Sequence, residues 1–162
     1  MAVGTVSGLN PDDNWQLISS GTPTSASSTY SFTSISGYKT LMIAFKKVGT
    51  NAGNNLIARF NGDSTDRNYN SLANGYEVTG YYTTTGIALT GYVDTSHSGY
   101  TVINNANSTT MFKTQQEGAA YVTNGYGGIW LNNTDAISSC VISTVTSTFN
   151  GTGTFYLYGI PA

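Results

Sequence analysis

Two carboxylates stand close together in residues 60–69, FNGDSTDRNY, which form the densest polar stretch of the chain. Asp63 and Asp66 have the residue type that a metal loop or an acid and base pair requires. A calcium loop of the EF-hand type needs oxygen ligands at alternating positions and a closing bidentate Glu, which this stretch lacks. An acid and a base need separate environments in a cleft, whereas the Asn-Gly pair before Asp63 is a strong turn nucleus. We therefore predict a structured connection between strands, in which Arg67 can pair with either carboxylate, and we leave open whether the carboxylates hold an ion.

A second group of catalytic residue types surrounds His97, the only histidine, which lies in DTSHSG beside Asp94, Ser96 and Ser98. Hydrolytic triads are assembled from distant segments and rarely from neighbours in one turn. We therefore expect an exposed loop histidine. The single Cys140 has apolar neighbours and is expected to be a small buried hydrophobe. One His and one Cys cannot build a zinc site, so we expect no catalytic, metal-binding or cofactor-binding residues and no enzyme.

Tyrosines in predicted loops are the remaining candidates for binding a ligand or partner. Tyr81, Tyr82, Tyr92 and Tyr100 are candidate contacts to sugar rings or to a protein partner, since Tyr offers contact area at low entropy cost. The alternative is that most of the twelve tyrosines are strand residues on a sheet face or at a subunit contact.

The composition limits the possible partners. Charged residues make up only 9% of the 162 residues, the net charge is -2, and the six Lys and Arg are scattered along the sequence. Such a chain cannot neutralise a run of phosphates or present a basic membrane-binding face, so we expect neither nucleic acid nor membrane as a partner. The first residues have no cationic region followed by an apolar one, and we expect synthesis in a cytoplasm.

Alternation of apolar and polar residues dominates the elements that must position these side chains. In TLMIAFKKV, residues 40–48, Leu41, Ile43 and Phe45 lie on one predicted strand face and Met42, Ala44 and Lys46 on the other. Similar runs occur at residues 15–19, 29–35, 55–61, 86–93, 100–104, 109–114, 119–122, 127–132, 136–149 and 153–160. The best helical candidate, residues 111–121, is broken by Gly118 and lacks a cap. The pattern predicts an all-β protein with two antiparallel sheets, as in a β-sandwich or jelly roll.

The chain start differs from the remainder. Residues 1–14 contain Pro11 and show little alternation, which predicts an extended arm that is either frayed or docked on a neighbour. Its apolar residues Val3, Val6 and Leu9 are candidate partner contacts. Residues 15–162 are expected to form a single β-sandwich domain.

A family resemblance covers most of the chain. Residues 125–162, GYGGIWLNNTDAISSCVISTVTSTFNGTGTFYLYGIPA, resemble the ending of small β-rich virion proteins of tailed bacteriophages, with a Gly-rich turn, an Ile-led strand and a terminal LYGI strand. The early W-x-L-I of residues 15–18, Y-x-F-T-S-I-S-G-Y-K-T-L-M-I of residues 30–43 and L-I-A-R-F-N-G-D of residues 56–63 are similar to the same family.

The resemblance implies an antiparallel jelly-roll sandwich, often trimeric, with a structural function and no catalytic residues. It favours a capsid decoration or cement protein that binds the major capsid protein on the virion surface. If the chain is a homotrimer, Trp130, Tyr156 and Tyr158 are candidates for the subunit contact. The alternative is a receptor-binding tail-fibre tip or a carbohydrate-binding module that recognises host glycans.

Overall fold

The computed structural model describes residues 14–53, 55–65, 68–74, 81–89, 95–119, 125–132 and 134–162. Within the strands, the side chains of residues 70–74, 81–84, 117–119 and 125–127 lie outside this description. Every regular element in the described ranges is a β-strand, which confirms the prediction of an all-β protein. None of the described residues belongs to a helix that is long and apolar enough to cross a membrane.

Twelve strands are described, and they form two antiparallel sheets. Their bounds are β1 (Gln16–Gly21), β2 (Thr29–Phe32), β3 (Tyr38–Gly49), β4 (Leu56–Phe60), β5 (Tyr69–Asn74), β6 (Tyr81–Thr84), β7 (Ile87–Ala88), β8 (Ser96–Asn104), β9 (Lys113–Ala119), β10 (Gly125–Trp130), β11 (Cys140–Thr144) and β12 (Thr154–Pro161). The large sheet has the order β1-β12-β3-β8-β9-β10-β5-β6, and the small sheet has the order β2-β11-β4-β7.

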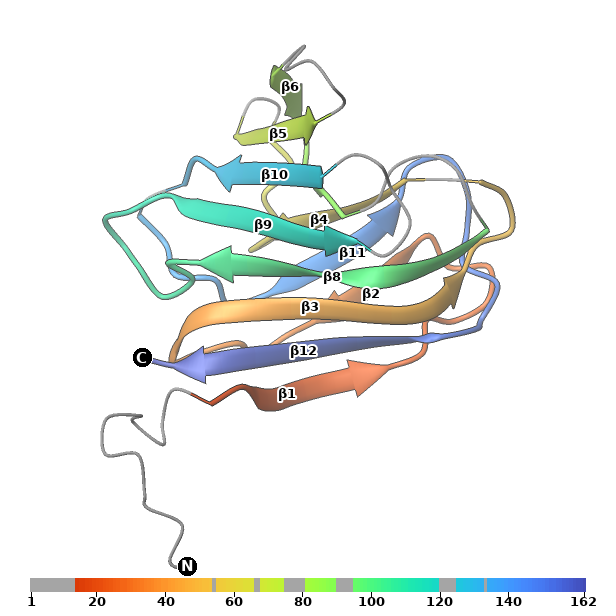
Figure 1. Cartoon of the computed structure of the whole chain (residues 1–162), viewed down its shortest axis with the longest axis horizontal. Coiled ribbons are helices and arrows are strands. Elements are labelled where there is room, and N and C mark those ends of the chain that lie inside the picture. The colour runs from red at the N-terminus through yellow and green to blue at the C-terminus, as the bar shows by residue number, and fades with distance from the viewer. Residues whose placement is uncertain are drawn as a thin grey trace, which may run out of the picture.

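The two sheets pack face to face as a sandwich. Figure 1 shows the large sheet toward the viewer, with β1, β12, β3 and β8 side by side and with β2, β11 and β4 behind them. Strands from the two ends of the sequence lie next to each other, because β12 pairs with both β1 and β3, and β11 pairs with both β2 and β4. The two-sheet prediction is therefore confirmed.

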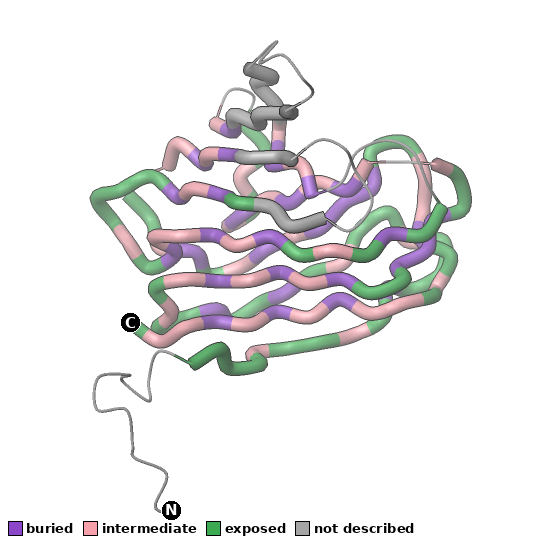
Figure 2. The backbone as a smooth tube through the Cα atoms, in the orientation of Figure 1, coloured by how far each residue is buried: buried purple, intermediate pink, exposed green. Residues whose placement is uncertain are grey.

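The core lies between the sheets and follows the predicted alternation. Leu41, Ile43 and Phe45 of β3 are buried, as are Phe155 and Leu157 of the neighbouring β12. Figure 2 shows buried and half-buried residues alternating along β12, β3 and β8, as expected for strands with one face toward the core. The sequence-based prediction that Leu41, Ile43 and Phe45 form the core face of this strand is thus confirmed.

Several strand predictions were wrong in their bounds; the run 136–149, for example, is a regular strand only at Cys140–Thr144. The run 109–114 enters β9 only at Lys113, and Met111 and Phe112 are exposed. A turn replaces the strand start because the Ser108 hydroxyl accepts hydrogen bonds from the backbone N–H groups of Thr110 and Met111. In addition, β5 and β6 occupy residues that the alternation pattern did not mark as strands.

Candidate interaction surface

The polar stretch at residues 60–69 begins with a tight turn at the end of β4. The backbone N–H of Asp63 donates to the carbonyl of Phe60 at 2.9 Å, and Asn61 and Gly62 between them have φ values of 53° and 71°. Positive φ at both central residues is typical of a type I′ turn and favours Asn-Gly. The Asn61 amide oxygen also accepts from the backbone N–H of Ser138 at 2.7 Å, so the turn is bonded to the segment before β11. The predicted structured connection is confirmed for its described part.

The Asp63 carboxylate joins this turn to the large sheet. One oxygen accepts from the indole N–H of buried Trp130 at 2.9 Å and from the Asn68 amide at 3.0 Å, and the other accepts from the backbone N–H of Thr65 at 2.9 Å. The Tyr69 hydroxyl donates to the Asp63 carbonyl at 3.0 Å. Asp63 is therefore a structural acceptor at a corner of the sandwich. Asp66 and Arg67 lie outside the described residues, and no cluster of three metal-ligating side chains occurs within them.

Stability should fall at acid pH because of Asp63. Burial raises the pKa of this carboxyl, but hydrogen bonds from Trp130, Thr65 and Asn68 outweigh burial and hold the pKa below its ordinary value of 3.8. A carboxyl whose pKa is lower in the folded state stabilises the fold above the unfolded-state pKa and loses that contribution as the pH falls through the folded-state pKa. We expect the urea midpoint to drop between pH 5 and pH 2 by less in Asp63→Asn than in the unchanged chain. Equal drops in both proteins would contradict this prediction.

The expectation of an exposed loop histidine was wrong. His97 is only 6% exposed and belongs to β8, where it lies opposite Val48. The strand begins at Ser96 because β3 continues to Gly49 and pairs with it, which brings the residues of DTSHSG after Asp94 into the sheet. Asp94 itself lies outside the described residues. Cys140 is buried as expected, and burial raises the pKa of its thiol to about 12, so it is not a thiolate at neutral pH.

Lys113 is a buried cation for which the sequence offered no signal. It is 1% exposed, and its ammonium group donates to the backbone carbonyls of Asn132 (3.1 Å) and Asp135. The same ammonium lies 5.2 Å from the centre of the Trp130 ring. Burial lowers the pKa of Lys113, and the negative charge of Asp135 partly offsets this effect. These contacts attach the loop after β10 to β9, which is a structural role.

The outward side of the large sheet has an unusual composition. Two neighbouring rows follow from the strand register. Leu17, Tyr158, Met42 and Val102 form one row, and Ser20, Tyr156, Ala44 and Tyr100 form the next; we name the seven residues other than Ser20 the outer patch. Solvated faces of antiparallel sheets are normally polar, whereas no position of the outer patch carries a charge. Leu17 is 56% exposed, Tyr100 is 47% exposed and the other five are half-buried. Apolar patches on a protein surface are frequent at interaction sites, which makes the outer patch the candidate interaction surface.

The predicted partner contacts divide into three groups. Tyr100 is exposed in the outer patch, although it lies on β8 and not in a loop. Tyr81 and Tyr82 belong to β6, and only their backbone pairing with β5 is described. Val3, Val6, Leu9 and Tyr92 lie outside the described residues, as does all of the predicted arm except Asn14.

The three aromatic residues suggested for a subunit contact lie in two different environments. Trp130 is 1% exposed and packs within the core against Phe60 and Tyr69, so it is not available to a second subunit. Tyr156 and Tyr158 point outward from β12, and their rings stack with centroids 6.3 Å apart. The alternation of β12 explains this difference, because Phe155 and Leu157 take the inward positions.

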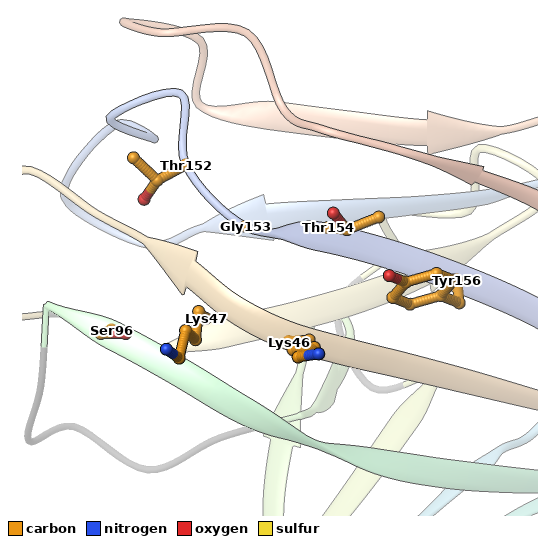
Figure 3. Close-up of a pocket in the computed structure, with 7 residues that line it drawn as sticks. All are labelled: Lys46, Lys47, Ser96, Thr152, Gly153, Thr154 and Tyr156. Carbon is orange, nitrogen blue, oxygen red and sulfur yellow. The ribbon is translucent and has the colours of Figure 1, made fainter.

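A shallow, open groove of about 530 Å³ adjoins one end of the outer patch. Figure 3 shows Lys46 and Lys47 projecting from β3 near Ser96 of β8 and near Thr154 and Tyr156 of β12. We name this the lysine groove, and its lining residues are Lys46, Lys47, Ser96, Thr152, Gly153, Thr154 and Tyr156. It contains two of the six Lys and Arg residues of the chain, which makes it a concentrated positive site on a molecule with few charges.

A β-bulge in β3 creates the lysine groove. Phe45 lies opposite Gly99 and Val48 lies opposite His97, so both Lys46 and Lys47 face the single residue Ser98 between them. Lys47 has a φ of 51°, and its backbone N–H donates to the Ser98 hydroxyl at 2.9 Å. Both lysines are exposed while Phe45 and Val48 on either side are buried. In a regular strand one of the two lysines would point into the core.

Comparison of the chain with protein-family models, with curated proteins and with solved structures gave no match.

Proposed function

We propose that the chain is a structural protein of a tailed-phage virion, most specifically a decoration protein that binds the major capsid protein as a homotrimer and stabilises the head. The single observation that carries this proposal is the outer patch, an uncharged aromatic and aliphatic face on a rigid sheet. The protein would be made in the host cytoplasm and located on the capsid surface.

The strand order supports a jelly-roll architecture as part of this proposal. Four antiparallel pairs are nested in the sequence: β1 with β12, β2 with β11, β3 with β8, and β4 with β7. The first and third pairs build the β1-β12-β3-β8 part of the large sheet, and the second and fourth pairs build the small sheet. A long hairpin rolled into two four-stranded sheets has this arrangement, with β9, β10, β5 and β6 as an extension. Jelly rolls serve in viral capsids and in lectins, so the architecture alone does not choose between these roles.

The chemistry of the outer patch suits attachment to a symmetric lattice. Apolar side chains on β3, β8 and β12 can be buried against a partner without desolvating a charge. Because a capsid repeats the same site many times, each contact can be weak while the assembled layer is held firmly. An uncharged contact also changes little with ionic strength.

Light scattering after size exclusion, followed by sedimentation with expanded capsids of tailed phages, tests the proposal. We expect a mass of three chains and a protein that pellets only when capsids are present, at 50 mM and at 500 mM salt alike. A protein that remains in the supernatant with capsids and binds host cells instead would overturn the decoration role and favour the receptor-binding alternative.

Charge placed in the outer patch should weaken partner binding. Leu17→Lys and Tyr100→Lys each introduce an ammonium group that a partner would have to desolvate, so we expect binding at least tenfold weaker with an unchanged melting temperature. Met111→Lys is the matched control, because Met111 is also exposed but lies in the turn before β9. Equal loss in Met111→Lys, or no loss in either patch variant, would show that another surface holds the partner.

A second candidate function is favoured by the lysine groove. A receptor-binding tip or carbohydrate-binding module needs a polar site that projects toward a ligand, and the groove combines two ammonium groups with hydroxyls and the Tyr156 ring. This candidate shares Tyr156 with the outer patch. It does not involve Leu17 or Met42, which lie in the other row of the patch.

A further inference from the structure

We propose that the lysine groove is a binding site for an acidic saccharide, in which a carboxylate or phosphate of the ligand pairs with Lys46 and Lys47 while a sugar ring lies on Tyr156. This site goes beyond the capsid-binding role, which rests on the outer patch. Tyr156 belongs to both surfaces, whereas Lys46 and Lys47 belong to the groove alone, so the lysine variants test the site separately.

The charges of the groove call for an anion. Lys46 and Lys47 are adjacent, both are exposed and both line the groove, so an anion bound there would be attracted by two ammonium groups. The two carboxylates whose side chains the structure describes are engaged elsewhere: Asp63 accepts from Trp130, and Asp135 accepts from Asn132 at 2.8 Å. Within the described part of the chain, the groove therefore carries positive charge that these carboxylates do not balance.

The wall of the groove is held in place before any ligand arrives. The Asn150 amide oxygen accepts from the backbone N–H of Thr152 at 3.0 Å and from its hydroxyl at 2.7 Å. The backbone N–H of Gly49 donates to the Thr152 carbonyl at 3.3 Å, and the N–H of Asn150 donates to the Gly49 carbonyl at 3.0 Å. These bonds fasten the loop before β12 to the end of β3. A preformed wall lowers the entropy cost of binding.

The neutral residues of the groove match a sugar. Ser96, Thr152 and Thr154 bring hydroxyl groups, which can both donate to and accept from sugar hydroxyls. Tyr156 presents a ring face and a phenol hydroxyl, and its stacking on Tyr158 supports the ring from the other row of the outer patch. A bare inorganic anion would use the ammonium groups and leave these contacts unused.

The number of charges argues against a nucleic acid as the occupant. Two cations on one strand neutralise one or two phosphates, whereas nucleic-acid surfaces neutralise a longer run. An open, shallow groove suits one or two sugar units of a longer chain that continues into solvent. Affinity at one site is expected at about 1 mM, with tighter apparent binding when several copies act together.

Titration of the full chain, labelled with ¹⁵N, provides the test. The probes are hyaluronan tetrasaccharide (carboxylated), glucose 6-phosphate, maltotetraose (neutral) and inorganic phosphate. We expect amide shifts centred on residues 46–47 and 152–156 for both acidic sugars, about tenfold weaker binding of maltotetraose and of inorganic phosphate, and weaker binding of the acidic sugars as salt rises.

Variants separate the two parts of the site. Lys46→Gln with Lys47→Gln should weaken both acidic sugars about tenfold, whereas Lys39→Gln, which removes an exposed lysine near the opposite end of β3, should not. Tyr156→Leu should weaken the sugars and leave inorganic phosphate unchanged. Inorganic phosphate binding as tightly as the acidic sugars would overturn sugar recognition, and an absence of shifts with every probe would overturn the site. Capsid sedimentation of the double lysine variant is expected to stay normal, so failure of one proposal does not mimic failure of the other.

Discussion

Replacing Gly153 with alanine is expected to lower the free energy of unfolding by about 3 kcal/mol or more. Gly153 has a φ of 77°, and a Cβ atom at this position would lie 2.2 Å from the carbonyl oxygen and 2.3 Å from the carbonyl carbon of Lys47. These are backbone atoms of the bulge in β3, so the clash can be relieved only by moving the bulge or the start of β12. Urea denaturation of the variant and of the unchanged chain measures the difference.

Gly37→Ala is the matched control for this experiment. Gly37 has nearly the same φ, 78°, but a Cβ atom there would have no neighbour within 4 Å. It therefore carries the backbone strain without the clash, and we expect a loss of about 1 kcal/mol. The difference between the two variants isolates the close approach of β12 to the bulge. Equal losses would mean that the bulge yields freely and that the lysine groove is not a rigid feature.

Replacing Asp63 with alanine is expected to lower the free energy of unfolding by about 2–3 kcal/mol. The variant leaves the buried indole N–H of Trp130 without its acceptor and removes the acceptor of the Asn68 amide and the Thr65 N–H. Burying an unsatisfied donor costs more than the net value of the hydrogen bond that held it. The effect is measured by urea or thermal denaturation at pH 7.

Asp135→Ala is the control that removes the other described carboxylate. Asp135 is exposed, its side chain accepts from Asn132 and Thr134 in a surface turn, and its charge partly offsets the burial of Lys113. We therefore expect a loss of about 1 kcal/mol, smaller than that of Asp63→Ala. Combining Asp63→Ala with Trp130→Phe should cost less than the sum of the two single changes, because the second change removes the orphaned N–H. Additive losses would contradict the assigned role of the Trp130 contact.

The structural effects of both substitutions bear on the proposed functions. Gly153 supports the bulge that turns Lys46 and Lys47 toward solvent, whereas Asp63 fixes the corner at which the chain passes from β4 to β5. We therefore expect the loss at Asp63 to reduce stability without altering saccharide binding by the remaining folded protein, while the loss at Gly153 alters both.

Local features were predictable from the sequence. The period-two pattern of residues 40–48 identified the buried face of β3, and the Asn-Gly pair at residues 61–62 identified the turn after β4. Cys140 was expected in an apolar environment and is buried in β11. Each of these features depends on residues within a few positions of each other, for which side-chain period and φ preference are sufficient.

Features that depend on the pairing of distant strands could not be predicted from the local sequence pattern. His97 appeared to be in a loop because its neighbours are turn formers, and only the extension of β3 past its bulge pairs it with Val48. Lys113 appeared to be one of several scattered cations. Only in the folded chain does the loop after β10 lie beside it and provide the carbonyls that accept hydrogen bonds from its ammonium group. Trp130 and Tyr158 appeared to be equivalent aromatics, although one is in the core and the other is on the outer patch.

The sequence by itself determined that this chain forms β-strands and where many of its turns lie, and its low charge led us to expect no nucleic-acid partner. The tertiary structure decided which strands are neighbours, and through them the outer patch, the bulge and the lysine groove. The physical reason is that alternation assigns a residue to one side of its own strand, but the function of that side depends on which distant strand lies beside it.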